Sequence, residues 1–162
     1  MYVDRVAGQT EFSGVVRVTR GDEVLCEHVS GLADRAHGIP NGLDTRFGIA
    51  SGTKGFTALA IMSLVSERSL ALDTPVRTLL GGEMSLIDAG VTVCHLLAHT
   101  SGIGDYLDET TTSGQIGGYA MPVPVHQLSS TYDYLAVLRG HPTKFEAGDR
   151  FEYCNSGFVV LA

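Results

Sequence analysis

The residues best suited to chemistry in this sequence are a serine and a lysine three positions apart, Ser51 and Lys54. They stand at the start of an apolar run that favours a helix over about residues 51–67. Residues three apart share one face of a helix, so the hydroxyl and the amine can meet. An amine in that place can take the proton of an alcohol and make it nucleophilic without a histidine. The pair is therefore a candidate for nucleophilic catalysis; the plainer alternative is a helix start with Ser51 as its cap and Lys54 in solvent.

A tyrosine and an asparagine two positions apart, Tyr153 and Asn155, form the second chemical candidate. Side chains two apart in extended backbone point the same way, so a phenol and a carboxamide can face one cavity. A phenol near a cation is more easily ionised and can carry the proton of the serine, while a carboxamide can hold a substrate amide or the lysine. Each motif is short enough to occur by chance, and their combination carries more weight than either alone.

The elements that must position these residues begin with a predicted β-hairpin. Residues 12–19 and 23–29 favour strands, the first of them rich in valine, and a turn at residues 20–22 separates them. Residues 31–44 are rich in Gly, Asp and Asn, which predicts a loop, and no third strand is expected after Val29. One hairpin alone is marginally stable, so it needs further strands or a helix against it.

Helices are expected to dominate the rest of the sequence. The run over residues 51–67 is apolar on most sides, which predicts a helix buried at the centre of the fold. Residues 102–121 contain five glycines, which predicts a long irregular loop. We expect three shorter helices, which begin near Pro75, at Val93 with Thr92 as its cap and His99 near its end, and after a cap at Ser130 or Thr131.

The expected elements fall into two regions, and the last element is expected to be incomplete. Residues 1–45 hold the hairpin and its loop, and residues 46–162 form a helical region that carries both motifs. The last residues, 156–162, are apolar and lack a C-terminal cap, so the chain is expected to stop within an element. Together with a hairpin that lacks partner strands, this predicts the front part of a longer protein, or strands supplied by another chain.

Composition excludes several classes of protein. The chain has 162 residues, 44% of them hydrophobic and 18% charged, which is typical of a globular domain. Its net charge of -7 and the absence of a basic run argue against binding to nucleic acid or to an anionic membrane. No apolar stretch reaches membrane-spanning length, and no apolar signal segment follows Met1. If Met1 is the true start, a cytoplasmic protein is expected.

The three cysteines of the chain lie far apart in sequence. They are expected to be small buried hydrophobes rather than a disulfide framework.

Four ordered sequence blocks, taken together, resemble a known family. They are residues 47–54 (FGIASGTK), 72–76 (LDTPV), 91–103 (VTVCHLLAHTSGI) and 145–158 (FEAGDRFEYCNSGF). The sequence is similar to the class C β-lactamase and penicillin-binding-protein family of serine hydrolases, over nearly its whole length. The resemblance implies an α+β fold, in which an antiparallel sheet is flanked by helices with an all-helical region beside it. The predicted hairpin would supply two strands of that sheet.

The same resemblance implies a role for each candidate residue. Ser51 would be the acylated nucleophile, Lys54 its proton partner, and Tyr153 the general base and later acid. Asn155 would position the substrate, which would be a small ester, a β-lactam or a D-amino peptide. No metal or organic cofactor is implied. Exposed apolar helix faces would favour self-association when the rest of the fold is missing.

One family feature is not found in residues 1–162. The family carries a third motif, Lys-Thr-Gly or His-x-Gly, on a strand after Tyr-x-Asn, and that strand supplies one of the two oxyanion-hole N–H groups. The N–H of Ser51 would be the other. Loss of one such donor costs on the order of a hundredfold to a thousandfold in turnover. We therefore expect the 162-residue chain to hydrolyse little when isolated.

Two other functions remain open at this point. The first is a scaffold or sensor of the same fold that acylates slowly or not at all. The second is a zinc hydrolase, because His95 and His99 stand four residues apart, a spacing that places two imidazoles on one helix face. The glutamate that zinc proteases place after the first histidine is Leu96 here, and no third ligand is evident in the sequence.

Overall fold

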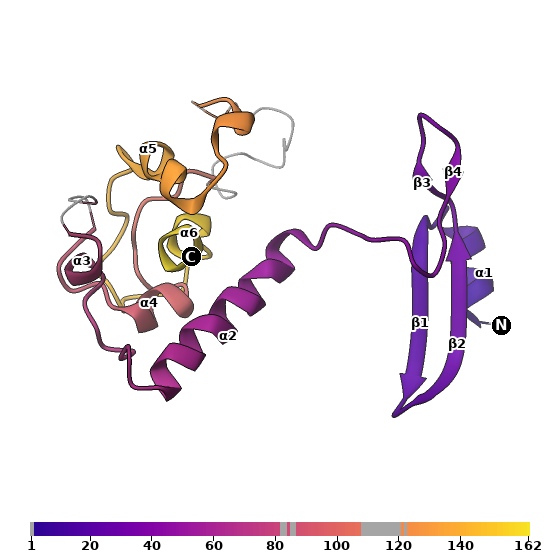
Figure 1. Ribbon diagram of the computed structural model, residues 1–162, viewed down its shortest axis with the longest axis horizontal. Coiled ribbons are helices and arrows are strands. Elements are labelled where there is room, and N and C mark those ends of the chain that lie inside the picture. The colour runs from indigo at the N-terminus through magenta and orange to yellow at the C-terminus, as the bar shows by residue number, and fades with distance from the viewer. Residues whose placement is uncertain (1, 82–83, 85–86, 108–120, 122) are drawn as a thin grey trace. The chain divides into compact units, whose positions relative to one another are not determined.

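The computed structural model describes residues 2–81, 84, 87–107, 121 and 123–162, and it divides into two compact units, Met1–Ile49 and Ala50–Ala162 (Figure 1). The sequence predicts the division between residues 45 and 46; that the two units are separate domains stays a prediction. Within the described ranges, no helix has the length and apolar character that a membrane span requires.

The first unit is built on the predicted hairpin. Strands β1 (Gly14–Arg20) and β2 (Glu23–Ser30) pair antiparallel, with Gly14 opposite Ser30 and Arg20 opposite Glu23. The register shifts between Val18 and Thr19. Gly21 takes the left-handed conformation (φ 58°) that the tight turn requires. The prediction of a hairpin is confirmed, and each strand runs one residue beyond its predicted C-terminal end.

A helix that the sequence did not predict packs against this hairpin. Helix α1 (Tyr2–Gln9) contacts β2, and Asp4 Oδ1 lies 2.8 Å from His28 Nδ1 of that strand. Eight residues make only about two helical turns, which is too short for apolar periodicity to be read. An isolated helix of this length is marginal in water, so contact with β2 must contribute to its stability.

The prediction of a plain loop after the hairpin is wrong. Strands β3 (Leu32–Asp34) and β4 (Ile39–Pro40) form a second, small antiparallel sheet, with Leu32 opposite Pro40. The His37 N–H donates to Asp34 Oδ1 at 3.0 Å inside the connecting turn. Strands of three and two residues carry too little alternation to be recognised among turn-forming residues.

The second unit begins with the long helix that carries the first motif. The 3₁₀-helix η1 (Ala50–Gly52) leads directly into α2 (Thr53–Ser66), so the predicted helix over residues 51–67 is confirmed. The prediction that it is buried is wrong, because Ile61 is its buried residue and apolar side chains elsewhere on it are exposed. Four of these are Phe56 (64% exposed), Leu59 (68%), Met62 (44%) and Leu64 (42%). The apolar residues surround the helix, and the described residues cover only part of it.

Two short helices follow and are tied together by backbone hydrogen bonds. Helix α3 (Val76–Leu79) follows Pro75, and α4 (Val93–Leu97) follows Thr92, whose side chain accepts the His95 N–H as predicted for a cap. Pro75 and Thr92 form an isolated antiparallel bridge. The Val76 N–H donates to the Val91 carbonyl at 2.9 Å, which fixes the start of α3 beside that of α4.

The segment that leads to the second motif runs beside the turn after α4. Three N–H groups of this segment donate to carbonyls of residues 99–102: Lys144 to Gly102, Gly148 to Thr100, and Glu152 to His99, at 2.8, 2.8 and 2.9 Å. His99 and Gly102 both have left-handed backbones, with φ of 56° and 66°. This pairing delivers Tyr153 and the residues after it to the end of α4.

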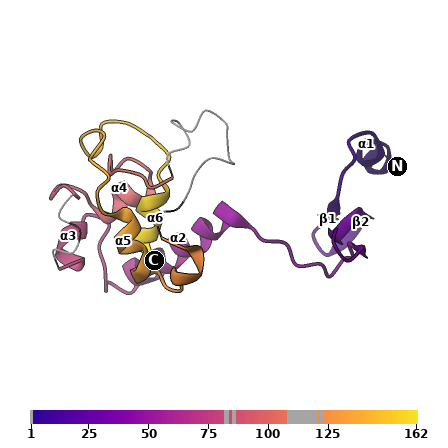
Figure 2. The same cartoon turned by 90° about the horizontal axis from the view of Figure 1, so that it is seen from above.

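The last helix lies at the centre of the second unit. Helix α6 (Asn155–Leu161) contacts α2, α4 and the 3₁₀-helix η3 (Thr131–Tyr134), and both views show it among these elements (Figures 1 and 2). The remaining elements are η2 (Val125–Gln127) and α5 (Leu135–Leu138). Ser130 stands at the N-cap position of η3, as predicted, and its N–H and hydroxyl both donate to Asp133 Oδ2. Most of the predicted loop over residues 102–121 lies outside the described residues.

The core of this unit forms where α3, α4, α5 and the start of α6 meet. Its buried members are Val76, Met84, Ile87, Val91, Leu96, Ile103, Leu138 and Cys154. Burial of each large side chain contributes roughly 1.5–3 kcal/mol relative to leaving it in water. The middle residue of the second motif, Cys154, is therefore part of the core.

Candidate active site

The structure brings the two predicted motifs together. Lys54 Nζ donates to Ser51 Oγ at 3.2 Å and to Asn155 Oδ1 at 2.9 Å. The first contact is local, because Ser51 and Lys54 stand on successive turns where η1 runs into α2. The second joins residues 101 positions apart in sequence and depends on α2 and α6 lying side by side. Lys54 thus links the nucleophile candidate to the asparagine of the second motif.

Tyr153 reaches the same hydroxyl from the opposite motif. Its phenol OH donates to Ser51 Oγ at 2.8 Å. Lys54 Nζ lies 4.9 Å from the centroid of the Tyr153 ring and 5.8 Å from that of Phe158, which places the amine over two aromatic faces. Ser51 Oγ therefore has two polar partners, one amine and one phenol, and each is able to move a proton.

His99 supports the Tyr153 side chain from behind. The two rings stack with centroids 4.5 Å apart, and His99 Nδ1 accepts the N–H of Cys154 at 3.1 Å. Burial lowers the pKa of His99, and the positive charge of Lys54 lowers it further. An acceptor at Nδ1 requires the neutral ring, so the electrostatics agree with the hydrogen bond.

Asp105 supports Asn155 in a comparable way. Its carboxyl is buried and accepts the N–H of Asn155 at 2.8 Å and that of Ser156 at 2.9 Å. No sequence pattern selects this residue for a role. A capping acid usually stands just before its helix, whereas Asp105 is 50 positions from Asn155 and stands within an irregular segment. Only the fold brings it to the start of α6.

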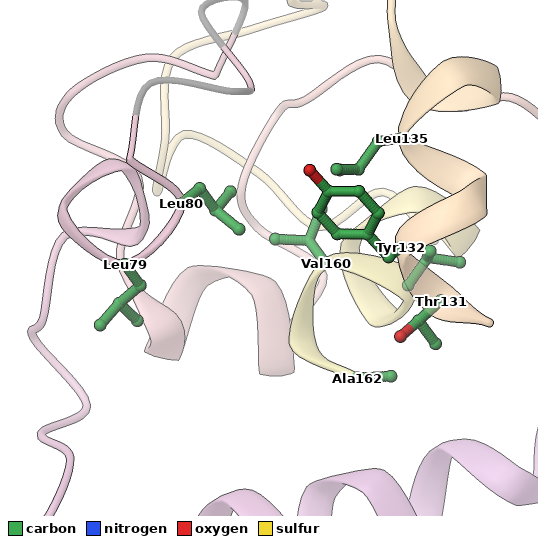
Figure 3. Close-up of a pocket in the computed structure, with 8 residues that line it drawn as sticks. Leu79, Leu80, Thr131, Tyr132, Leu135, Val160 and Ala162 are labelled. Carbon is green, nitrogen blue, oxygen red and sulfur yellow. The ribbon is translucent and has the colours of Figure 1, made fainter.

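An open cleft lies over these residues. It has a volume of about 400 Å³ and is lined by Ser51, Lys54 and Asn155 together with side chains of α2, η3 and α6. A second pocket of about 300 Å³ adjoins it and shares Thr131, Val159 and Ala162 with its lining. Figure 3 shows this second pocket, whose walls are mostly apolar. The labelled apolar side chains around it are Leu79, Leu80, Leu135 and Val160.

The two histidines considered for zinc are not arranged as the sequence suggested. Helix α4 ends at Leu97, and His99 takes a left-handed conformation beyond it, so the rings do not share a helix face. His95 Nδ1 bonds to Thr92 at the start of α4, whereas His99 Nδ1 faces Cys154. In the described part of the chain, no three His, Cys, Asp or Glu side chains are grouped so that they could hold a metal ion.

The cysteines occupy three different environments. Cys154 is buried, Cys26 is partly buried and Cys94 is exposed, and all three are free thiols. The expectation of three buried hydrophobes is therefore wrong for Cys94, because that position of α4 faces solvent. Burial raises the pKa of the Cys154 thiol to about 11, with a smaller contribution from Asp105. Cys154 is thus a packing residue within the second motif and not a nucleophile.

Comparison with known proteins agrees with this geometry. The chain is 46% identical over 99 residues to esterase EstB of Burkholderia gladioli, an alignment that covers 59% of the chain and 25% of the esterase. It is 33% identical over 149 residues to a D-aminopeptidase of Brucella anthropi, covering 92% of the chain and 26% of that enzyme. The chain thus spans about a quarter of the length of these two curated relatives.

A solved structure gives the same result for the fold. The penicillin-binding protein from Bacillus halodurans superposes with a TM-score of 0.82 at 36% identity, over 98% of this chain and 47% of that one. The fold is therefore of the β-lactamase and transpeptidase type, as the resemblance implied. A model of the family described as "Beta-lactamase" matches residues 2–162, and the chain belongs to that family.

Proposed function

We propose that the protein is a serine hydrolase that passes through an acyl-serine intermediate at Ser51. The observation that carries this proposal is the convergence of Lys54 Nζ and the Tyr153 hydroxyl on Ser51 Oγ, at 3.2 and 2.8 Å. A serine hydroxyl with two proton-transferring partners is the arrangement that nucleophilic catalysis needs when histidine does not act as the base. The esterase and D-aminopeptidase relatives support the same reaction class.

The chemistry divides into two steps. Tyr153 first gives its own proton to water. As Ser51 Oγ attacks the substrate carbonyl, the Ser51 O–H bond breaks and its proton passes to the Tyr153 oxygen. The tetrahedral adduct then collapses, the bond to the leaving group breaks, and Tyr153 returns the proton to that group. Water later attacks the acyl-serine carbonyl and gives a proton to the Tyr153 oxygen. Tyr153 returns a proton to Ser51 Oγ as the bond between Ser51 and the acyl group breaks. Lys54 orients Ser51 Oγ and is its second proton partner, and Asn155 holds Lys54 and faces the substrate cleft.

An uncharged ester is the substrate class that the described cleft suits best. Apart from Lys54, the residues that line it carry no lysine or arginine, so they offer no second cation for a substrate carboxylate. The adjoining apolar pocket can receive an alkyl or aryl group of the same substrate. The 46% identity to an esterase points the same way.

Turnover of three reporter substrates tests this proposal. We expect the protein encoded by the complete gene to hydrolyse a p-nitrophenyl ester faster than a D-alanine anilide or a chromogenic cephalosporin. The Ser51→Ala variant should lose this activity, whereas Ser63→Ala, on the exposed surface of the same helix, should retain it. Ester hydrolysis that survives in Ser51→Ala would overturn the proposal. A wild-type protein inactive on all three substrates would instead support the scaffold alternative.

We also propose that a polypeptide limited to residues 1–162 associates with itself through α2. The exposed Phe56 and Leu59 side chains, at 64% and 68%, form an apolar surface on this helix. Size-exclusion chromatography of that polypeptide should show oligomers that Phe56→Ser together with Leu59→Ser disperses. A monomer at the highest soluble concentration would contradict this.

A further inference from the structure

Three successive backbone N–H groups at the second motif all donate hydrogen bonds to side chains of one distant segment. The N–H of Cys154 donates to His99 Nδ1 at 3.1 Å, and those of Asn155 and Ser156 donate to Asp105 at 2.8 and 2.9 Å. The first N–H groups of a helix have no partner within it, so an outside acceptor decides how the helix start is placed. Residues 99–105 supply those acceptors for α6.

The Asp105 carboxyl uses both of its oxygens for this purpose. Oδ2 accepts the Asn155 N–H, while Oδ1 accepts the N–H and the hydroxyl of Ser156, at 2.9 and 3.0 Å. Oδ1 also accepts the N–H of Leu107 at 3.4 Å. Asp105 is only 6% exposed, and each of these partners is a hydrogen-bond donor. A buried acceptor surrounded by donors tolerates little displacement, because any shift leaves a polar group unsatisfied.

From Asp105 a continuous set of contacts leads to the nucleophile. The Asn155 backbone is fixed by Asp105, and its side chain donates from Nδ2 to the Leu107 carbonyl at 3.2 Å. These two bonds aim Asn155 Oδ1 at Lys54 Nζ, 2.9 Å away. Lys54 Nζ in turn donates to Ser51 Oγ. Without Asn155 in this place, Lys54 loses one of the two polar partners that direct it.

We propose that Asp105 is a positioning residue for acylation: by capping α6 it sets Asn155, and through Asn155 it sets Lys54 against Ser51. Asp105 does not touch Ser51 and transfers no proton. The inference rests on the proposed function, since it assigns a second residue to the same reaction. It differs from a plain capping role, which would stabilise α6 and leave the rate at each folded site unchanged.

The Asp105→Asn variant separates these two roles with the smallest change in shape. An amide keeps one acceptor oxygen, but its NH₂ group would face a backbone N–H, so two donors would meet. The start of α6 must then shift away. A displacement of about 1 Å in a supporting group costs roughly a hundredfold in rate when it misaligns the reacting atoms. Asp149→Asn is the matched control, because Asp149 is exposed and its carboxylate pairs with Arg150 at 3.3 Å.

The experiment uses the protein encoded by the complete gene and counts active sites before measuring rates. A fluorophosphonate probe titrates the reactive serine, and ester hydrolysis is then expressed per titrated site. We expect Asp105→Asn to lower kcat per site by roughly tenfold to a hundredfold, with KM changed by less than about threefold. Asp149→Asn should match the wild type. Equal kcat per site in Asp105→Asn would overturn the inference, even if its melting temperature fell.

A second variant covers the case in which Asp105→Asn does not fold. Ser156→Ala removes the hydroxyl that donates to Asp105 and accepts the Tyr106 N–H at 3.0 Å, and leaves the two backbone bonds to Asp105 in place. It should lower kcat per site by about threefold to tenfold; an unchanged value would count against the inference. Absence of probe labelling in the wild type would overturn the proposed function, and the inference with it, whereas a labelled wild type with unaffected variants overturns the inference alone.

Discussion

The two helices that carry the candidate site are held in the molecule in contrasting ways. Helix α2 carries Lys54 in its first turn and directly follows Ser51 in η1, yet most of its surface is exposed and Ile61 is its buried residue. Helix α6 is half as long, but its first four residues are buried and side chains of residues 99–105 bind its N–H groups. The first pair of site residues is therefore arranged by helix geometry, and the second by tertiary contacts.

Because of this difference, substitutions at the two helices should affect activity and stability to different extents. A change to a site residue of α2 should remove function while the fold is little affected, because few buried contacts depend on it. A change around the start of α6 should lower both activity and stability, because the residues there position the site and are also buried in the core. Four predictions test this contrast.

Lys54→Met should produce the largest loss. The variant keeps an unbranched side chain and removes the amine that binds Ser51 Oγ and Asn155 Oδ1. We expect kcat for ester hydrolysis to fall by about 10²–10⁴, the range typical of a proton-transferring group, with little change in melting temperature. Lys144→Met is the matched control, since the other lysine of the chain pairs with Glu152 at 2.6 Å and does not reach Ser51. Equal losses in both variants would contradict the assignment.

Tyr153→Phe should cost somewhat less, on the order of a hundredfold in kcat. It removes the hydroxyl at 2.8 Å from Ser51 Oγ but keeps the ring that stacks on His99 at 4.5 Å, so the fold should persist. Tyr2→Phe serves as control, because Tyr2 is 72% exposed and lies in helix α1 of the first unit. Steady-state kinetics that show no difference between these two variants would remove Tyr153 from the mechanism.

Gly102→Ala tests the stability of the segment behind α6. Gly102 has φ +66°, and a Cβ there would collide with the carbonyl oxygen of Phe145. Gly140 also has positive φ, at +90°, but open space surrounds its Cβ position. We expect Gly140→Ala to lower the free energy of unfolding by about 1 kcal/mol from backbone strain, and Gly102→Ala by about 3 kcal/mol. Denaturant unfolding measures both, and similar values would show that the close approach to Phe145 is not maintained.

The smallest expected effect is a pH dependence that originates at His99. Burial and Lys54 hold its pKa below the ordinary 6.5, while the negative charge of Asp105 opposes this shift. The unfolded chain therefore binds the proton more readily than the folded one. The stabilising contribution is complete above about pH 6.5 and is lost as the pH falls towards the folded pKa.

His99→Asn isolates this effect, because asparagine tolerates the left-handed backbone of His99 (φ 56°) but does not titrate. Urea midpoints at pH 7 and pH 5 should differ less in the variant than in the wild type. An unchanged difference would show that other groups carry the pH dependence.

The features that could be predicted from the sequence are set by local contacts, whereas those that could not be predicted depend on tertiary contacts. The meeting of Ser51 and Lys54 was predictable because helix spacing alone determines it. The cap at Thr92 and the hairpin turn at Gly21 were equally local. The role of Asp105 was not, because its partners are 50 and 51 positions away and no pattern at Asp105 itself indicates them.

The incorrect predictions have related causes. Helix α1 and strands β3 and β4 are too short for periodicity to reveal. His95 and His99 were expected on one helix face, but the left-handed backbone at His99 ends that face early. The burial of α2 was inferred from apolar residues on all its sides. Such residues indicate that the helix surface needs to be covered, but the described part of the chain covers only some of it.

The most direct test of the central claim is the site of covalent modification. The protein encoded by the complete gene is treated with a fluorophosphonate, and the adduct is located by intact mass and peptide mapping. We predict one adduct per chain, on Ser51, which is lost in Ser51→Ala and forms much more slowly in Lys54→Met and Tyr153→Phe. An adduct on another residue, or labelling of Ser51 at the wild-type rate in both of those variants, would contradict it.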